Sequence, residues 1–140
     1  MSSTTNFIIV DDDKLVNMFC SMMIKKNLGQ SKVKTFEVPE SGLEFIEKAE
    51  FIEPENESRT VLFLDINMPS MTGWEFLEYF EKLDDRIKNS LKIYILSSSV
   101  DERDKERAAA NKYVTAFFVK PLTKDMLLST TEAEQRADKN

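Results

Sequence analysis

Five short, mainly apolar runs recur along the chain and alternate with segments of helical periodicity. They occupy residues 7–10, 33–36, 61–64, 93–96 and 116–119. An apolar run of this length is typical of a strand covered on both faces, and strands that alternate with helices form parallel sheets. The sequence therefore predicts an α/β fold, a doubly wound five-stranded parallel sheet with helices on both faces. The 140 residues suffice for one such domain.

Helical segments are predicted after each of these strands. The first begins after Asp13, which is expected to cap it, and ends at Gly29. Its apolar residues at helical spacing, expected to form a packing stripe, are Leu15, Val16, Met18, Phe19, Met22 and Met23. Oppositely charged residues three apart support a helix over 101–110 without a broad apolar face. The acidic, turn-rich stretch 50–59 is predicted to be a loop.

Composition excludes several classes of function. The formal net charge is −6 and no long Lys/Arg run occurs, so nucleic acid is not an expected partner. No apolar run is long enough for a secretion signal or a membrane span. Histidine is absent, which excludes histidine-based catalysis and histidine-ligated zinc. Cys20 is the only cysteine and is expected to be a buried, inert thiol, as in a cytoplasmic protein.

Polar side chains follow the predicted strands at their carboxyl ends. Asp11 and Asp12 come after the first strand, Asp65 after the third, Ser97 after the fourth and Lys120 after the fifth. In a doubly wound sheet these positions meet at one edge. Several carboxylates that converge without sulfur or imidazole ligands are suited to a hard divalent cation, above all Mg²⁺. The sequence therefore predicts an acidic Mg²⁺ site at this edge.

A carboxylate beside Mg²⁺, an ammonium group and a hydroxyl can attack a phosphoryl group and hold it as an acyl phosphate. Asp65 is the predicted nucleophile, Lys120 would neutralise charge on the phosphoryl oxygens, and Ser97 would donate a hydrogen bond to one of them. Each residue alone has an ordinary alternative, since an Asp after a strand is often a helix cap and a Ser often belongs to a turn. Their joint placement at four strand ends favours a common site.

Four motifs in order resemble the receiver domain of two-component response regulators. They are VDDD (10–13), LDINMPSMTG (64–73), LSSS (96–99) and FFVKP (117–121). The resemblance covers about residues 5–133 and leaves residues 134–140 as a polar C-terminal tail. It is to stand-alone, chemotaxis-regulator-like receivers, because no DNA-binding or catalytic segment follows residue 133; a fragment of a longer regulator is the alternative. The resemblance implies a flavodoxin-like fold with strand order 2-1-3-4-5.

The resemblance also implies a role for each acidic residue. Asp65 corresponds to the phosphoacceptor, Asp12 to a direct Mg²⁺ ligand and Asp11 to a ligand that acts mainly through water. Asn67 would offer its backbone carbonyl to the metal. Lys120 corresponds to the family lysine, and the peptide bond that follows it is usually cis in the family.

The implied switch consists of Ser97 and the aromatic residue Phe117. Phosphorylation would draw Ser97 toward the phosphoryl group and turn Phe117 inward. The surface formed by the helix at 101–110, the last strand and the last helix would then change. The sequence departs from the family's pattern in three places. Tyr113 and Val114 stand where a small Gly-Ala pair is common, the acidic stretch 50–59 is longer than a minimal connection, and Phe117 replaces the commoner Tyr.

The partners implied are a sensor histidine kinase or a histidine phosphotransfer protein as phosphodonor, and a downstream protein of unknown identity. Such a domain is not an enzyme in the ordinary sense, because it catalyses only its own Mg²⁺-dependent phosphorylation and dephosphorylation. The rival hypothesis is a Mg²⁺-dependent phosphatase with an Asp nucleophile. These enzymes carry a second Asp two residues after the nucleophile, whereas this chain has Asn67, which cannot transfer a proton in that way.

Overall fold

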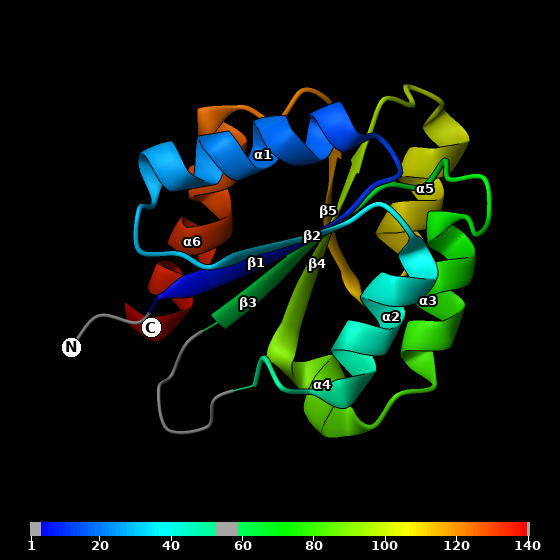
Figure 1. Ribbon diagram of the computed structural model, residues 1–140, viewed down its shortest axis with the longest axis horizontal. Helices are drawn as coiled ribbons and strands as arrows, with labels where there is room; N and C mark the ends of the chain where they lie inside the picture. Colours follow the sequence, from blue (N-terminus) through cyan, green and yellow to red (C-terminus); the bar gives the residue numbers. More distant parts are fainter. Residues whose placement is uncertain (1–3, 53–58, 140) are drawn as a thin grey trace.

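The computed structural model describes residues 4–52 and 59–139, with side chains as far as Thr131. Five parallel strands form one sheet in the order β2-β1-β3-β4-β5, which confirms the predicted topology (Figure 1). The strands are β1 (Thr5–Val10), β2 (Val33–Phe36), β3 (Arg59–Leu64), β4 (Leu91–Ser97) and β5 (Val114–Val119). Because β1 and β3 are the central neighbours, the acidic residues that follow them are brought to adjacent positions.

Helices cover both faces of the sheet (Figure 1). On one face lie α1 (Lys14–Asn27) and α6 (Lys124–Lys139). On the other lie α2 (Pro39–Lys48), α3 (Gly73–Glu81), α5 (Glu102–Ala110) and the short α4 (Asp85–Ser90). The sequence did not predict α4, because six residues are too few to show a helical period; it begins where the Asp84 side chain accepts a hydrogen bond from the backbone N–H of Ile87.

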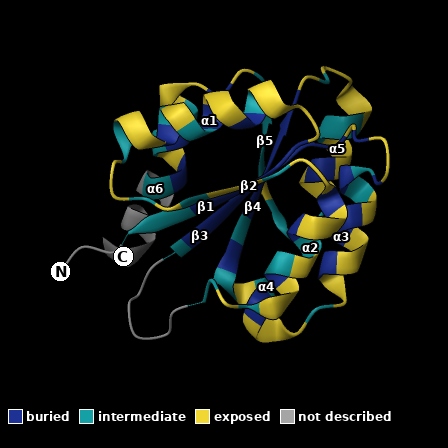
Figure 2. Ribbon diagram, in the orientation of Figure 1, coloured by how far each residue is buried: buried dark blue, intermediate teal, exposed yellow. Residues whose placement is uncertain are grey.

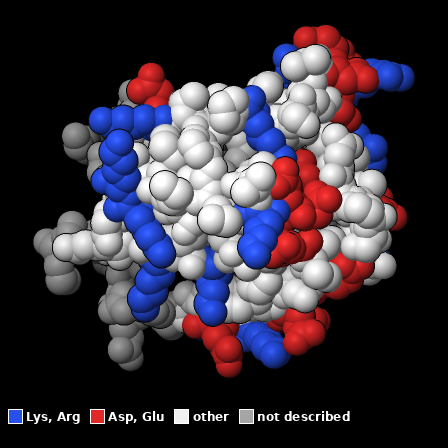
Figure 3. All heavy atoms as spheres, turned by 45° about the horizontal axis from the view of Figure 1, so that its top comes forward, with Lys and Arg blue, Asp and Glu red and all other residues white. Residues whose placement is uncertain are grey.

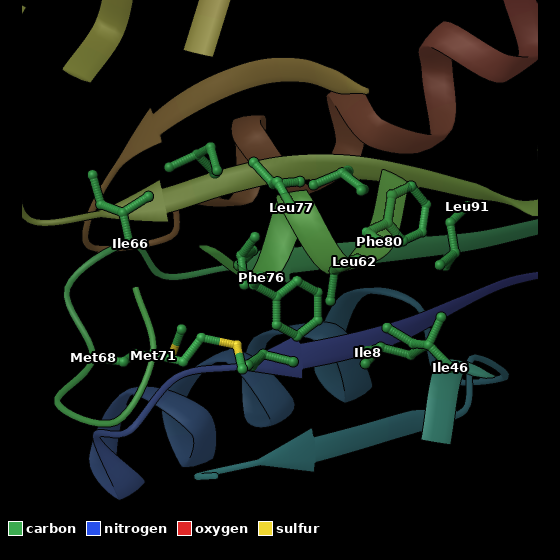
Figure 4. Close-up of a cluster of buried hydrophobic side chains, with 14 of the residues drawn as sticks. Ile8, Ile46, Leu62, Ile66, Met68, Met71, Phe76, Leu77, Phe80 and Leu91 are labelled. Carbon is green, nitrogen blue, oxygen red and sulfur yellow. The ribbon is translucent and has the colours of Figure 1, made fainter. Parts of the chain in front are cut away.

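Each face of the sheet has its own apolar cluster, because successive strand residues point to opposite sides. Ile8, Leu62 and Ile93 point toward α2 and α3, where Phe76 and Phe80 meet them (Figure 4). The residues that point toward α1 and α6 are Phe7, Ile9, Val61, Phe63, Tyr94 and Leu96. Figure 2 shows the buried residues gathered along the central strands, which accordingly form a rigid support for the site at their carboxyl ends.

The rotation of α1 about its axis differs from the prediction. Asp13 caps the helix as expected, with its side chain accepting a hydrogen bond from the backbone N–H of Leu15. However, the buried residues of α1 are Asn17, Cys20 and Ile24. Four members of the predicted packing stripe are exposed instead, namely Leu15 (73 %), Met18 (51 %), Phe19 (43 %) and Met22 (67 %).

The error arises because apolar residues occur nearly all round α1, so that periodicity alone does not select its inner face. Val16 and Met23 are the members of the stripe that pack, partly buried, against the sheet. Cys20 is buried as predicted, and burial, together with the negative charge of Asp11, raises the pKa of its thiol to about 12. The thiol is therefore inert at neutral pH.

The C-terminal helix is longer than the sequence predicted. Helix α6 continues to Lys139, whereas the sequence predicted fraying after about residue 132. The domain boundary at residue 133 stays a prediction.

Most of the acidic stretch 50–59 lies outside the described residues. Within the part of the chain that the structure describes, no helix is both long and apolar enough to cross a membrane.

The apolar cluster on the α2 and α3 side of the sheet predicts a large effect of truncating Phe80 and a small effect of truncating its neighbour Tyr79. Phe80 is fully buried and packs edge-on against Tyr113, with ring centroids 5.5 Å apart. Phe80→Ala is expected to lower the free energy of unfolding by about 3–5 kcal/mol in urea titrations. Tyr79→Ala, at a half-exposed position of the same helix, should change it by less than about 1 kcal/mol. Equal effects of the two substitutions would contradict this packing.

Candidate functional site

The carboxyl edge of the sheet brings Asp11 and Asp65 side by side. Val10 and Leu64, the last residues of β1 and β3, are partners in the parallel register, and each Asp follows directly. The backbone N–H of Asp65 continues the ladder by donating to the Val10 carbonyl at 3.0 Å. Asp11 in turn donates to the Phe36 carbonyl at the end of β2, also at 3.0 Å. Extended strands therefore hold both backbones in place.

Three carboxylates converge at this edge. One oxygen from each of Asp11, Asp12 and Asp65 lies within 4.8 Å of the others. Asp11 and Asp65 are buried, with 2 % and 5 % of their surface exposed, whereas Asp12 is open to solvent. An oxygen-only donor set with one open side fits a hard divalent cation that keeps part of its water shell. In the described part of the chain, these three residues form a group that could hold a metal.

Lys120 places one positive charge against the cluster. Its Nζ lies 2.6 Å from Oδ2 of Asp11 and 3.6 Å from Oδ1 of Asp65. The backbone N–H of Lys120 donates to the Ser97 carbonyl at 2.8 Å, and its peptide bond to Pro121 is cis. The residue therefore enters the site from the end of β5. Three carboxylates facing one ammonium leave two formal negative charges, which one divalent cation would neutralise.

Burial dominates the protonation of the buried groups. Burial, with the negative charge of Asp11 added, raises the pKa of Asp65 to about 6, although Lys120 opposes the shift. Burial also raises the pKa of Asp11, against the hydrogen bond from Lys120. For Lys120, burial alone would lower the pKa, but its hydrogen bonds and charge pairing with Asp11 and Asp65 raise it overall. The lysine therefore stays charged, and Asp65 ionises at a higher pH than an ordinary carboxylate does.

Asp11 is the most constrained of the acids. Its Oδ1 accepts a hydrogen bond from the backbone N–H of Asp13 at 2.8 Å, and its Oδ2 is occupied by Lys120. Asp12 has no side-chain hydrogen bond or ion pair to any described residue, so its oxygens are available. The direct metal contact of Asp12 and the water-mediated one of Asp11 stay predictions.

Ser97 and Phe117 lie at the neighbouring strand ends. Ser97 is fully buried, and its Oγ accepts a hydrogen bond from the backbone N–H of Ser99 at 3.1 Å, which leaves the hydroxyl proton free to be donated. Phe117 pairs with Ile95 in the register of β4 and β5 and is half-buried against the α3 side of the sheet. Among the described residues, no hydrogen bond joins Ser97 to Asp65, so the switch roles stay predictions.

The loop after β3 holds Asp65 by close backbone packing. A Cβ atom at Gly73 would lie 2.5 Å from the Asp65 carbonyl oxygen and 2.8 Å from Cα of Ile66, so that only glycine fits. Asn67 is exposed, and its backbone N–H points at Oδ1 of Asp65 over a long 3.5 Å. Its proposed carbonyl contact to a metal stays a prediction.

Asn17 contacts the site and was not predicted from the sequence. It is buried in the first turns of α1, and its Nδ2 donates to the backbone carbonyl of Asp11 at 2.8 Å. The available signal was an amide among the apolar residues near the start of the first helix. Reading that signal required the rotation of α1, which the sequence pattern did not provide.

A family model described as the response regulator receiver domain matches residues 7–132. The chain belongs to this family. The chemotaxis protein CheY of Listeria monocytogenes is 30 % identical over 125 residues, which cover 89 % of this chain and 93 % of the relative.

Solved receiver structures have the same fold. A response regulator receiver protein from Dyadobacter fermentans is 25 % identical with a TM-score of 0.81, covering 93 % of this chain and 97 % of its own. A two component response regulator from Cytophaga hutchinsonii has the same identity and TM-score, covering 94 % and 97 %. The chain is thus a CheY-like receiver domain of two-component signalling, a signalling domain and not a classical enzyme, which leaves the phosphatase hypothesis without support.

The raised pKa of Asp65 predicts that its charge destabilises the metal-free receiver. The folded-state pKa lies above the ordinary value of 3.8, so the penalty is absent below about pH 4 and complete above about pH 6. Asp65→Asn is expected to raise the free energy of unfolding in EDTA by about 1–3 kcal/mol at pH 7. The gain should nearly vanish at about pH 4, where wild-type Asp65 is neutral in the folded state.

The matched control is Glu44→Gln on exposed α2, which should change the free energy of unfolding by less than about 0.5 kcal/mol at both pH values. A pH-independent effect of Asp65→Asn, or a loss of stability at pH 7, would contradict the electrostatic account of the site.

Proposed function

We propose that this receiver accepts a phosphoryl group from a phosphohistidine onto Asp65, with Mg²⁺ bound, and thereby changes a partner-binding face. The observation that supports it most is the buried Asp65 carboxylate beside two other carboxylates, with the Lys120 ammonium 3.6 Å away. At neutral pH such a carboxylate carries its charge at an electrostatic cost, and a cation that offsets its neighbours would remove this cost while the carboxylate stays an ionised nucleophile.

The residues present fit Mg²⁺, because the converging donors are all carboxylate oxygens and one side is open to water. Asp12 and Asp65 would hold the ion directly, Asn67 through its carbonyl, and Asp11 through water. When bound, Mg²⁺ supplies positive charge that offsets the negative charge on the phosphoryl oxygens.

In the transfer, an Oδ of Asp65 forms a bond to phosphorus while the bond from phosphorus to the donor imidazole nitrogen breaks. The imidazole leaves with the electron pair of that bond. The Lys120 ammonium moves toward the phosphoryl oxygens, and the Ser97 hydroxyl donates a hydrogen bond to one of them. Attack by water on the acyl phosphate later restores Asp65. The chain thus catalyses only its own phosphorylation and dephosphorylation.

The switch would act through Ser97 and Phe117. Movement of Ser97 toward the phosphoryl group gives up the hydrogen bond from Ser99 and opens space into which the half-buried Phe117 can turn. The face of α5, β5 and α6 then changes its fit to a downstream protein. The same proposal assigns the receiver to the cytoplasm, with no nucleic-acid or membrane partner, in keeping with one buried free thiol and an acidic net charge.

The exposed side of α1 supports a protein phosphodonor. Leu15, Met18, Phe19 and Met22 form one apolar stripe that begins four residues after Asp11. Figure 3, which brings the α1 side forward, shows a broad uncharged area with Lys and Arg side chains along part of its border and acidic side chains beyond it. Exposed apolar area of this kind marks binding sites. We assign it to a phosphohistidine-bearing helical partner with apolar residues and an acidic border.

The position of the α1 surface relative to Asp65 also favours a phosphohistidine-bearing partner. For in-line transfer the donor's phosphorus must approach an Asp65 oxygen to about 3–3.5 Å, with the donor nitrogen on the far side of the phosphorus. A partner seated on α1 lies next to the opening at Asp12, the one solvent-exposed member of the acidic cluster.

Incubation with acetyl phosphate and Mg²⁺, followed by intact mass measurement, tests the chemistry. One added phosphoryl group is expected, and it should be lost in Asp65→Ala or with excess EDTA. Asp13→Ala is the matched control, because Asp13 is the adjacent carboxylate but caps α1 instead of facing the cluster. An unchanged mass with both acetyl phosphate and a phosphohistidine protein, or labelling that survives Asp65→Ala, would overturn the proposal.

The docking surface predicts a selective defect. The double variant Met18→Ser, Met22→Ser is tested with a phosphohistidine protein that labels the wild type. Phosphotransfer to it should be roughly 10-fold slower, because each substitution removes apolar contact with the donor protein. Labelling by acetyl phosphate should be unaffected. Val100→Ser, at an exposed apolar position away from α1, is the control. Equal slowing with both donors would place the defect in the chemistry and contradict docking on α1.

A further inference from the structure

Asn17 is a buried amide that is only half satisfied. Its Nδ2 donates to the Asp11 carbonyl at 2.8 Å, while its Oδ1 is buried and has no hydrogen-bond partner in the described part of the chain. The carbonyl can only accept, so the amide nitrogen must face it and the unpaired oxygen must face away. A buried acceptor without a partner costs about 1–3 kcal/mol.

This arrangement is a poor way to stabilise a helix. The other buried residues on the same side of α1 are Cys20 and Ile24, so the surroundings suit an apolar side chain. A leucine of similar size would remove the unpaired oxygen and lose one hydrogen bond, with little net change in stability. The contribution of Asn17 must therefore be sought in what its hydrogen bond holds.

The bond holds the peptide from which Asp12 projects. Asp11 is already fixed through its N–H by the Phe36 carbonyl and through its carboxylate by Lys120. Its carbonyl belongs to the peptide unit that leads into Asp12, and Asn17 is the side chain that orients this unit. The Asp12 carboxylate itself has no hydrogen-bond or ion-pair partner among described residues. The direction of Asp12 thus depends on the backbone behind it.

We infer that Asn17 is a positioning residue for the divalent-cation site: by holding the Asp11 carbonyl, it keeps the Asp12 carboxylate beside that of Asp65. The inference rests on the proposed function to the extent that this site binds Mg²⁺. Groups that orient metal ligands from behind commonly change metal affinity by 10- to 100-fold when they are removed.

The test compares two asparagines of one helix. Asn27 makes the same type of bond, from its Nδ2 to the Met23 carbonyl at 2.8 Å, but at the far end of α1. Mg²⁺ affinity is measured by calorimetric titration of the full chain, and stability by urea unfolding in EDTA. Asn17→Leu is expected to raise the Kd for Mg²⁺ about 10-fold. Its urea midpoint of unfolding in EDTA should stay close to that of the wild type. Asn27→Leu should leave the Kd unchanged.

The outcomes separate the hypotheses. A folded Asn17→Leu protein with wild-type Kd overturns the inference and leaves the proposed function intact. Absence of Mg²⁺ binding by the wild type overturns both. Asn17→Met, with a flexible side chain that tolerates irregular space, is made in parallel. If neither Asn17 variant folds, or if Asn27→Leu raises the Kd for Mg²⁺ as much as Asn17→Leu does, Asn17 has a purely structural role and the inference is wrong.

Discussion

The crowding of three carboxylates beside one ammonium is the constraint on which the rest of the structure depends. Two unit charges 4.8 Å apart repel by about 3 kcal/mol at an effective dielectric constant of 20, and burial adds a desolvation cost. A chain free to relax would separate them. Here the ladder from β2 through β1 to β3 fixes the backbones of Asp11 and Asp65, and the β5 end delivers Lys120. The mutually repelling carboxylates stay close together because the sheet is rigid.

The faces of the sheet and its carboxyl edge have opposite effects on stability. The apolar clusters around Phe76 and Phe63 supply the free energy that the acidic site reduces. A divalent cation would offset the repulsion among the three carboxylates, so its binding would relieve an electrostatic cost that the metal-free fold already carries. Helix α1 contributes on both of its sides: a hydrogen bond from Asn17 on the inner side holds the Asp11 carbonyl, and the outer side carries exposed apolar residues.

The residues that follow each strand could be recognised from sequence because their meeting depends only on parallel topology. Once strands end at Val10, Leu64 and Val119, the side chains after them must share one edge. The same logic did not reach α4, which is too short for a period, or the face that α1 turns inward. Apolar residues on most sides of α1 made its stripe ambiguous, and a capping Asp marks where a helix begins without setting its rotation.

The sequence by itself determined the order of the elements, the family and the chemical groups available at the sheet edge, because those depend on local periodicity and on motifs read along the chain. Only the tertiary structure decided which charged groups lie in contact and that both oxygens of the Asp11 carboxylate have partners, whereas Asp12 has none among the described residues. It also decided that the Asn17 amide is buried against the Asp11 carbonyl. Those outcomes depend on distances between segments far apart in the chain, and such distances arise only when the sheet and helices pack together.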